Sequence, residues 1–153
     1  TKLENFLFDI HTGKAKALVD MDTIMPHTWL SDWGDMMRSL VNPAGEKETN
    51  LDRIQIDLDV FQSAAKGFLG SARFVPAAEI GFLADAVPIM ALELGVRFLA
   101  DYMRGDTDFM LSTEEPRDLN RTRAMVQFRL FEELRNKAGA LKEILKSLKL
   151  RSK

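Results

Sequence analysis

An amide and two carboxylates stand at the ends of a short strand–turn–strand pattern near the beginning of the chain. Asn5 opens a first apolar run, and Asp20 and Asp22 follow a second apolar run that begins after a glycine-containing turn. Carboxylate and amide oxygens that converge at the open end of a hairpin suit a hard cation such as magnesium. A structural interpretation stays open beside this one, in which Asn5 and Asp20 only cap the strand ends.

The elements that would position these groups form a predicted β-hairpin over residues 5–21. If Thr12 and Gly13 are the two turn residues, Asn5 lies directly opposite Asp20, with their Cβ atoms about 4.5–5.5 Å apart. One face would then turn toward the core with six apolar residues: Phe6, Phe8, Ile10, Ala15, Ala17 and Val19. A change of one residue in loop length would break this register.

The rest of the sequence predicts helices. Apolar residues recur at helical spacing over four segments: 33–40, 51–68, 76–103 and 118–149. Ser31 or Asp32 could cap the first of these helices. Pro88 is expected to kink or divide the third helix, and Gly105 to end it. The sequence therefore predicts a mainly α protein with an N-terminal β-hairpin.

Composition limits the class of protein. With 153 residues, 46% of them hydrophobic and 29% charged, residues 1–153 are expected to form a single globular domain. The absence of cysteine excludes a disulfide scaffold, thiolate metal sites and a cysteine nucleophile, and it fits a reducing compartment. Two histidines leave little room for a histidine metal cluster.

Charge and hydropathy argue against two kinds of partner. Basic residues outnumber acidic ones in residues 111–153, but they are spread along a predicted helix and few aromatic residues lie among them. A solvated helix face is therefore favoured over a nucleic-acid interface. No apolar stretch approaches the ~20 residues that a membrane span needs, and no secretory signal opens the chain. We expect a cytoplasmic protein that binds neither nucleic acid nor membranes.

The order of these motifs resembles a known family. Kinase-like phosphotransferases have a catalytic Asp five residues before an Asn, followed by a strand, a turn, a second strand and a metal-binding Asp. Residues 1–9 followed by 18–23 resemble that stretch with its first residues missing. The chain looks like a member of the aminoglycoside phosphotransferase-type family, closest to the N-acetylhexosamine 1-kinase branch. The other matching segments are Asp20–Pro26, Asp32–Asp35, Asp57–Phe61, Lys66–Leu69, Leu92–Tyr102, and Asn120 and Arg121 with Arg123.

The resemblance implies a fold, an activity and residue roles. It implies the helical C-terminal lobe of a protein kinase-like fold, and transfer of the ATP γ-phosphate to a sugar hydroxyl, the anomeric hydroxyl of an N-acetylhexosamine. Asn5 and Asp20 would bind the Mg²⁺ that bridges the nucleotide phosphates, with Asp22 as a further candidate. Asp35 would support the catalytic loop, and Arg97 would face the sugar acceptor.

The sequence departs from the family pattern in two places, and these departures bear on the implied substrate and activity. Asp108, which follows Gly105, Asp106 and Thr107, stands where the hexosamine kinases usually carry a tyrosine, so the sugar preference is open. The catalytic Asp would immediately precede Thr1, and the small lobe with its glycine-rich loop and lysine has no counterpart here. We therefore expect a C-terminal fragment without a catalytic residue of its own, inactive by itself.

Alternatives remain at the level of the protein and of single residues. The parent could phosphorylate another small alcohol, such as an aminoglycoside or an amino alcohol, or the chain could be a non-catalytic helical binding or scaffold module. Arg97 could simply pair with Glu93 or Asp101, four residues away on a helix. An uncovered apolar surface at Leu3 and the region Trp29–Trp33 would make the fragment self-associate.

Overall fold

The computed structural model describes residues 5–21, 26–72, 74–76 and 78–151. An antiparallel hairpin precedes five α-helices, which confirms the predicted fold class, mainly α with an N-terminal hairpin. The strands and α-helices are β1 (Phe6–Phe8), β2 (Ala15–Leu18), α1 (Trp29–Leu40), α2 (Leu58–Ser71), α3 (Leu83–Arg104), α4 (Leu119–Asn136) and α5 (Ala138–Arg151). Two 3₁₀ turns, η2 (Leu51–Arg53) and η3 (Glu79–Phe82), precede α2 and α3.

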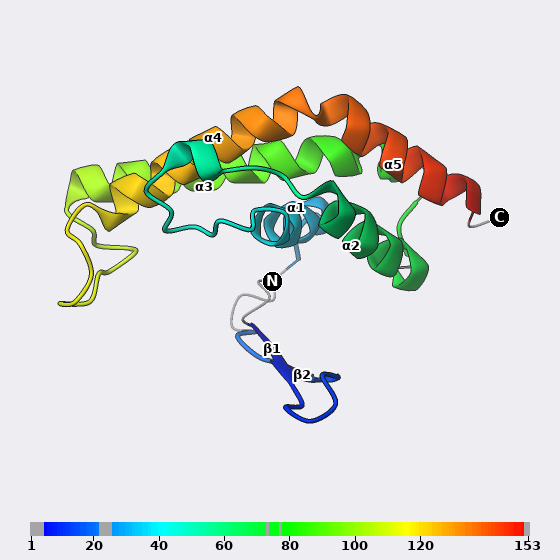
Figure 1. Cartoon of the computed structure of the whole chain (residues 1–153), viewed down its shortest axis with the longest axis horizontal. Coiled ribbons are helices and arrows are strands. Elements are labelled where there is room, and N and C mark those ends of the chain that lie inside the picture. Colours follow the sequence, from blue (N-terminus) through cyan, green and yellow to red (C-terminus); the bar gives the residue numbers. More distant parts are fainter. Residues whose placement is uncertain (1–4, 22–25, 73, 77, 152–153) are drawn as a thin grey trace.

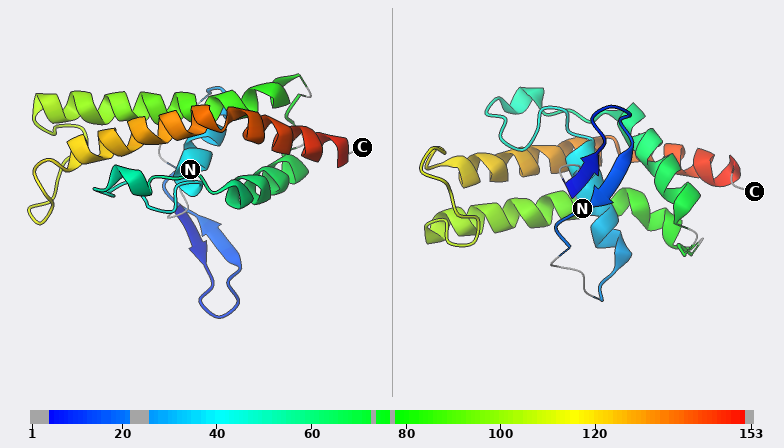
Figure 2. Two further views of the ribbon diagram at one scale, coloured as in Figure 1. Left: turned by 45° about the horizontal axis from the view of Figure 1, so that its top comes forward. Right: turned by 90° about the horizontal axis from the view of Figure 1, so that it is seen from below.

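The helices form one body from which the hairpin projects. α3 and α4 run antiparallel side by side, and α5 continues beyond the end of α4 (Figure 1). α1 crosses α3, and α2 packs against α5. Both Figure 1 and the left view of Figure 2 show β1 and β2 extending away from the helices.

The hairpin is one residue out of the predicted register. The paired residues are Phe6 and Leu18, Leu7 and Ala17, and, beyond a β-bulge, Phe8 and Ala15. The cause lies in the turn, where the Asp9 carboxylate accepts hydrogen bonds from the backbone amides of His11 and Thr12 at 3.1 and 2.8 Å. These bonds build a connection longer than the two-residue loop that the prediction assumed.

The predicted core face of the hairpin is also wrong. Ile10 is 90% exposed, and Phe8 and Val19 are 48% and 39% exposed. One reason is the register, which pairs the residues of the second strand with different partners from those predicted. The other is that the hairpin does not pack on the helical core, so neither of its faces is buried there.

Helix α1 begins four residues earlier than predicted. Its cap is Thr28, whose hydroxyl accepts a hydrogen bond from the Leu30 amide at 3.4 Å, and neither Ser31 nor Asp32 has that role. Asp32 lies in the first turn, where a carboxylate favours the helix dipole. Gly34 sits where α1 crosses α3, so the chain has no side chain at the point of closest approach.

The predicted helix over residues 51–68 is divided. A 3₁₀ turn at η2 is followed by a short extended segment that buries Ile54 and Ile56, and α2 starts only at Leu58. Asp57 caps α2, because its carboxylate accepts hydrogen bonds from the Asp59 and Val60 amides, both at 3.0 Å. The apolar residues at the start of this segment are therefore buried by an extended chain, although their spacing is typical of a helix.

Of the two predicted effects of Pro88, a kink or a division, the division does not occur, because α3 runs through Pro88 as one helix. Val87 and Ala91, on either side of the proline, are both fully buried, so packing holds the helix together where one backbone hydrogen bond is missing. Gly105 ends α3 with a φ of 93°, as predicted.

The predicted final helix is two helices. α4 ends at Asn136 and α5 begins at Ala138, with Lys137 between them in a non-helical conformation. The ammonium group of Lys137 donates to the backbone carbonyl of Ile56 at 3.2 Å. This contact ties the break between α4 and α5 to the extended segment before α2.

The main core lies where α1, α2, α3, α4 and α5 meet. Its largest fully buried members are Trp33, Met37, Ile54, Phe61, Leu83, Leu130, Leu134 and Leu141. A smaller cluster of Leu94, Phe98 and Ala124 fills the far end of the α3–α4 pair. Among the helices of the described residues, none is both long and apolar enough to cross a bilayer.

Candidate functional site

The side chains of Asn5 and Asp20 meet at the open end of the hairpin. The Asn5 amide nitrogen donates to a carboxylate oxygen of Asp20 at 3.2 Å. The backbone amide of Val19 donates to the Asn5 carbonyl at 2.9 Å, so Val19 rather than Asp20 is the backbone partner of Asn5. The predicted contact therefore forms, although the register that predicted it is wrong.

Asp20 has an unusual backbone for a residue with a side chain. Its φ is 59°, in the left-handed region that non-glycine residues enter rarely and at some cost in free energy. Such conformations concentrate at binding and catalytic sites, although aspartate tolerates this one better than most residues. The exposed Asp20 carboxylate is held beside Asn5 by that local conformation.

These two residues fit a magnesium site completed by other ligands. Mg²⁺ usually takes one or two protein carboxylates and fills its remaining positions with waters and substrate phosphates. The Asp20 carboxylate and the Asn5 amide oxygen are ligands of this kind, and both are exposed or partly exposed. Within the described residues no group of three or more acidic or histidine side chains gathers around a possible metal position. Asp22 lies outside the described residues.

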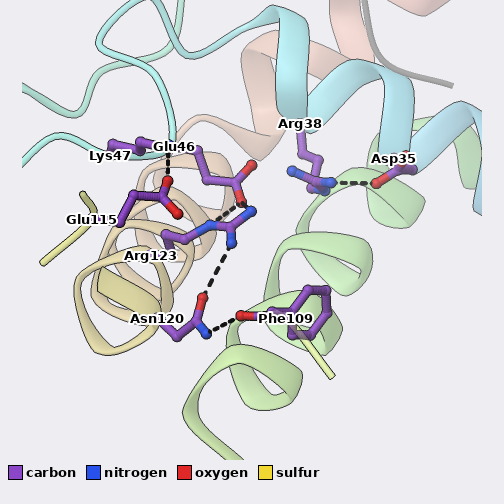
Figure 3. A network of polar contacts seen from close by, with 8 residues as sticks. All are labelled: Asp35, Arg38, Glu46, Lys47, Phe109, Glu115, Asn120 and Arg123. Carbon is purple, nitrogen blue, oxygen red and sulfur yellow. Dashed lines mark hydrogen bonds and ion pairs between the residues drawn. The ribbon is translucent and has the colours of Figure 1, made fainter. Parts of the chain in front are cut away.

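Asp35 is paired with a buried arginine on the next turn of α1. The Arg38 guanidinium donates to the Asp35 carboxylate, and the Arg38 side chain is only 3% exposed while that of Asp35 is 28% exposed (Figure 3). Burial works against ionisation of Asp35, but the pKa of the carboxyl is lowered, and the charge and hydrogen bond of Arg38 contribute most to that lowering. Asp35 is thus an ionised carboxylate with part of its surface open.

Arg97 projects from an exposed part of α3. It lies 3.6 Å from Glu93, which confirms one of the two pairings open at the sequence level. Its guanidinium also lies over the Phe109 ring, 5.3 Å from the centroid. The Arg97 side chain is 58% exposed, so the charge remains available to a ligand.

The other proposed partner of Arg97, Asp101, has a different role. Asp101 is fully buried, and its carboxylate accepts hydrogen bonds from three successive backbone amides, at 3.0, 2.9 and 2.8 Å, in residues 107–109. Burial works against ionisation, but these amides outweigh it and lower the pKa of Asp101. Asp101 therefore fixes the loop that carries Asp108 and Phe109.

Sequence inspection did not identify the polar network that holds the same loop to α4. Arg123 forms an ion pair with Glu46 at 2.7 Å, donates to Asn120 at 3.1 Å, and stacks on Phe98 with its guanidinium 4.1 Å from the ring centroid. Asn120, fully buried, donates to the Phe109 carbonyl at 2.8 Å. Figure 3 shows Glu46 from the loop after α1, Asn120 and Arg123 from α4, and Phe109 from the loop before it converging on one place.

A second ion pair joins the loop after α1 directly to the loop before α4. The ammonium group of Lys47 lies 2.6 Å from the Glu115 carboxylate, beside the Glu46–Arg123 pair (Figure 3). Asn120 and Arg123 were noticed only as parts of the family pattern, because their partners lie far away in the sequence. The signal that could have found them is a pair of polar residues on the otherwise apolar face of a predicted helix.

The candidate residues occupy separate parts of the surface. Within the described residues, no hydrogen bond or ion pair joins Arg97 to Asn5 or Asp20. Of the expected apolar surface at Leu3 and the region Trp29–Trp33, Trp33 is buried at 1% exposure, Trp29 is partly buried and stacks on Phe68 at 5.9 Å, and Leu3 lies outside the described residues; the expected self-association stays a prediction. No protein-family model matches this chain. The family therefore remains a prediction from the motifs.

Proposed function

We propose that this chain is the helical lobe of a small-molecule kinase of the aminoglycoside phosphotransferase type. The parent reaction would move the γ-phosphate of ATP to a sugar hydroxyl, the anomeric hydroxyl of an N-acetylhexosamine. One observation carries the proposal: an amide and a carboxylate separated by a strand, a turn and a strand meet at the open end of the hairpin. That is the arrangement which kinase-like enzymes use for their metal ions.

Each candidate residue would make a distinct contribution. Asn5 and Asp20 would hold Mg²⁺, which when bound neutralises the charge of the nucleotide phosphates. Asp35, kept ionised by Arg38, would accept hydrogen bonds from the catalytic loop. Arg97 would donate to the acceptor from its exposed position. The resemblance puts the residue that orients the acceptor hydroxyl immediately before Thr1.

A cationic acceptor is the second candidate, and Asp108 favours it. Its side chain is 63% exposed and lies 3.7 Å from Arg104, itself 62% exposed. An exposed pair at this distance contributes little stability, so Asp108 could exchange its partner for a ligand ammonium group at small cost. An aminoglycoside or amino alcohol would offer such a group. The two candidates differ only in the acceptor.

An acceptor screen with the longer parent protein tests the proposal. We expect magnesium-dependent phosphorylation of N-acetylhexosamines, reduced at least about a hundredfold by Asp20→Ala because the Mg²⁺ that would neutralise the phosphates loses its carboxylate ligand. Asp52→Ala is the matched control, since Asp52 is exposed like Asp20 but lies in the first turn of η2, away from the hairpin. Phosphorylation of amino alcohols instead would favour the second candidate. Activity that survives Asp20→Ala, or no activity with any acceptor, would contradict both and favour a scaffold role.

A further inference from the structure

Phe109, in the loop between α3 and α4, is fixed through both of its backbone polar groups. Its amide donates to the Asp101 carboxylate at 2.8 Å, and its carbonyl accepts a hydrogen bond from the Asn120 amide nitrogen at 2.8 Å (Figure 3). Asp101 belongs to α3 and Asn120 to α4, and both residues are fully buried. The two helices therefore decide where the backbone of Phe109 lies.

The aromatic ring of Phe109 is fixed as well. Its centroid lies 4.6 Å from that of the Phe98 ring, and the two planes are tilted by 58°. Aromatic pairs favour such inclined arrangements at this separation. Phe98 is 1% exposed and belongs to the smaller core cluster, so the Phe109 ring rests on a buried and immobile neighbour.

Arg97 on α3 is the exposed residue that this ring supports. Its guanidinium carbon lies 5.3 Å from the Phe109 centroid, within the ~6 Å range of a cation–π contact. The Glu93 carboxylate, one turn earlier on α3, lies 3.6 Å from the same guanidinium. A long side chain with two such contacts has less conformational freedom to lose when it binds a ligand. Arg97 is thus preorganised, although its side chain is 58% exposed.

We propose that Phe109 is a positioning residue for the acceptor and that it acts through Arg97. The inference rests on the proposed function, because that function assigns Arg97 to the acceptor. The ring holds the guanidinium in place before the acceptor arrives, so binding costs less side-chain entropy. The effect falls on acceptor binding and not on ATP, whose phosphates belong with the proposed magnesium site at the hairpin.

A structural role of Phe109 has to be separated from this positioning role. The side chain also covers the cluster of Leu94, Phe98 and Ala124, so its replacement can lower stability without any effect on Arg97. Phe109→Leu keeps an apolar side chain over the cluster but removes the aromatic face that attracts a cation. Phe109→Tyr keeps that face. A change that appears in the leucine variant and is absent from the tyrosine variant therefore comes from the ring.

Steady-state kinetics of the longer parent protein test the inference. We expect Phe109→Leu to raise the KM for the acceptor about two- to fivefold, which is the fold-change that an exposed cation–π contact accounts for, and to leave the KM for ATP unchanged. Phe109→Tyr should keep the wild-type acceptor KM. In the Arg97→Ala background, Phe109→Leu should have no further effect on the acceptor KM, because it acts only through Arg97.

NMR of the 153-residue chain gives a result that does not depend on kinase activity. Phe109→Leu should shift the Nε–Hε signal of Arg97, because the ring current of the aromatic face is lost, and Phe109→Tyr should leave that signal near its wild-type position. Arg53 supplies the control signal, since it is 69% exposed and pairs with Glu48 at 3.0 Å in another part of the chain.

The outcomes distinguish this inference from the function on which it rests. An Arg97 signal that Phe109→Leu leaves in place, an unchanged acceptor KM in that variant, or the same rise of KM in the Arg97→Ala background would each overturn the role of Phe109 while the kinase function stands. A wild-type parent that phosphorylates no acceptor would overturn the proposed function, and the role of Phe109 with it.

Discussion

The substitution Gly34→Ala should push α1 away from α3, because it adds a methyl group where the two helices are in closest contact. A Cβ at this position would lie 2.8 Å from the Ala86 carbonyl oxygen and 2.5 Å from Cγ of Met90. The Met90 side chain can rotate away, but the Ala86 carbonyl belongs to the backbone of α3 and cannot. Gly34→Ala therefore forces α1, which carries Asp35 and Arg38, to move away from α3.

The free energy of unfolding should fall by the cost of that displacement. Forcing an extra methyl group into a packed core costs about 1–3 kcal/mol. Alanine also favours the helix over glycine by about 1 kcal/mol, which offsets part of the loss. Gly67→Ala is a matched control on α2, because its Cβ would have no heavy atom within 4 Å. The difference between the two variants cancels the helix preference and leaves about 1–3 kcal/mol.

Thermal unfolding of both variants measures this difference. For a chain of this size about 1 kcal/mol corresponds to ~2–4 °C in Tm, so Gly34→Ala should unfold some 2–12 °C below Gly67→Ala. Gly67→Ala itself should be slightly more stable than the wild type. Equal stabilisation by both substitutions would refute the close approach of α1 and α3 at Gly34.

Three further predictions concern the core and the polar network. Leu130→Ala should cost about 2–5 kcal/mol, measured by urea unfolding, because the side chain is fully buried. A double-mutant cycle on Glu46→Gln and Arg123→Gln should give a coupling energy of about 0.5–3 kcal/mol, since their side chains are 21% and 18% exposed and in direct contact. Asp101→Asn should destabilise the protein at pH 7, as measured by thermal unfolding. That difference from the wild type should shrink below about pH 4, because a carboxyl with a lowered pKa contributes stability that is lost as the pH falls through its folded-state value.

Each of these predictions has a contrary outcome. A loss below about 1 kcal/mol for Leu130→Ala would mean that the buried core of α4 is loosely packed. Additive effects of Glu46→Gln and Arg123→Gln would show that the ion pair does not couple the loop after α1 to α4. A destabilisation by Asp101→Asn that stays constant from pH 7 to pH 3 would show that the charge of Asp101 does not hold its loop.

The sequence predicted the elements of the fold better than their boundaries. Helical spacing of apolar residues identified most of the helical sequence, and the glycine-containing turn identified the hairpin. The register could not be predicted because it depends on hydrogen bonds that the Asp9 carboxylate accepts from the backbone amides of His11 and Thr12. The sequence could not decide between a kink and a division at Pro88 for a similar reason: packing of the buried Val87 and Ala91 keeps α3 undivided, and packing is not visible in the spacing of residues.

In the candidate site, too, contacts within one element could be predicted and contacts between distant elements could not. The contact between Asn5 and Asp20 was predicted, because the two residues flank one hairpin and any nearby register brings them close. The partner of Arg123 could not be predicted, since Glu46 lies 77 residues earlier and only the tertiary fold brings the loop after α1 against α4. Local pattern thus identifies groups within one element, and tertiary packing decides the rest.

Metal binding at the hairpin tests the central claim most directly. Mn²⁺ alone, added to the ¹⁵N-labelled chain, should selectively broaden the NMR signals of Asn5 and of residues 19–21. The broadening should disappear in Asp20→Asn and persist in Asp52→Asn, which removes an exposed charge from another part of the chain. Broadening that ignores Asp20→Asn, or that spreads evenly over the acidic surface, would contradict a metal site formed by Asn5 and Asp20.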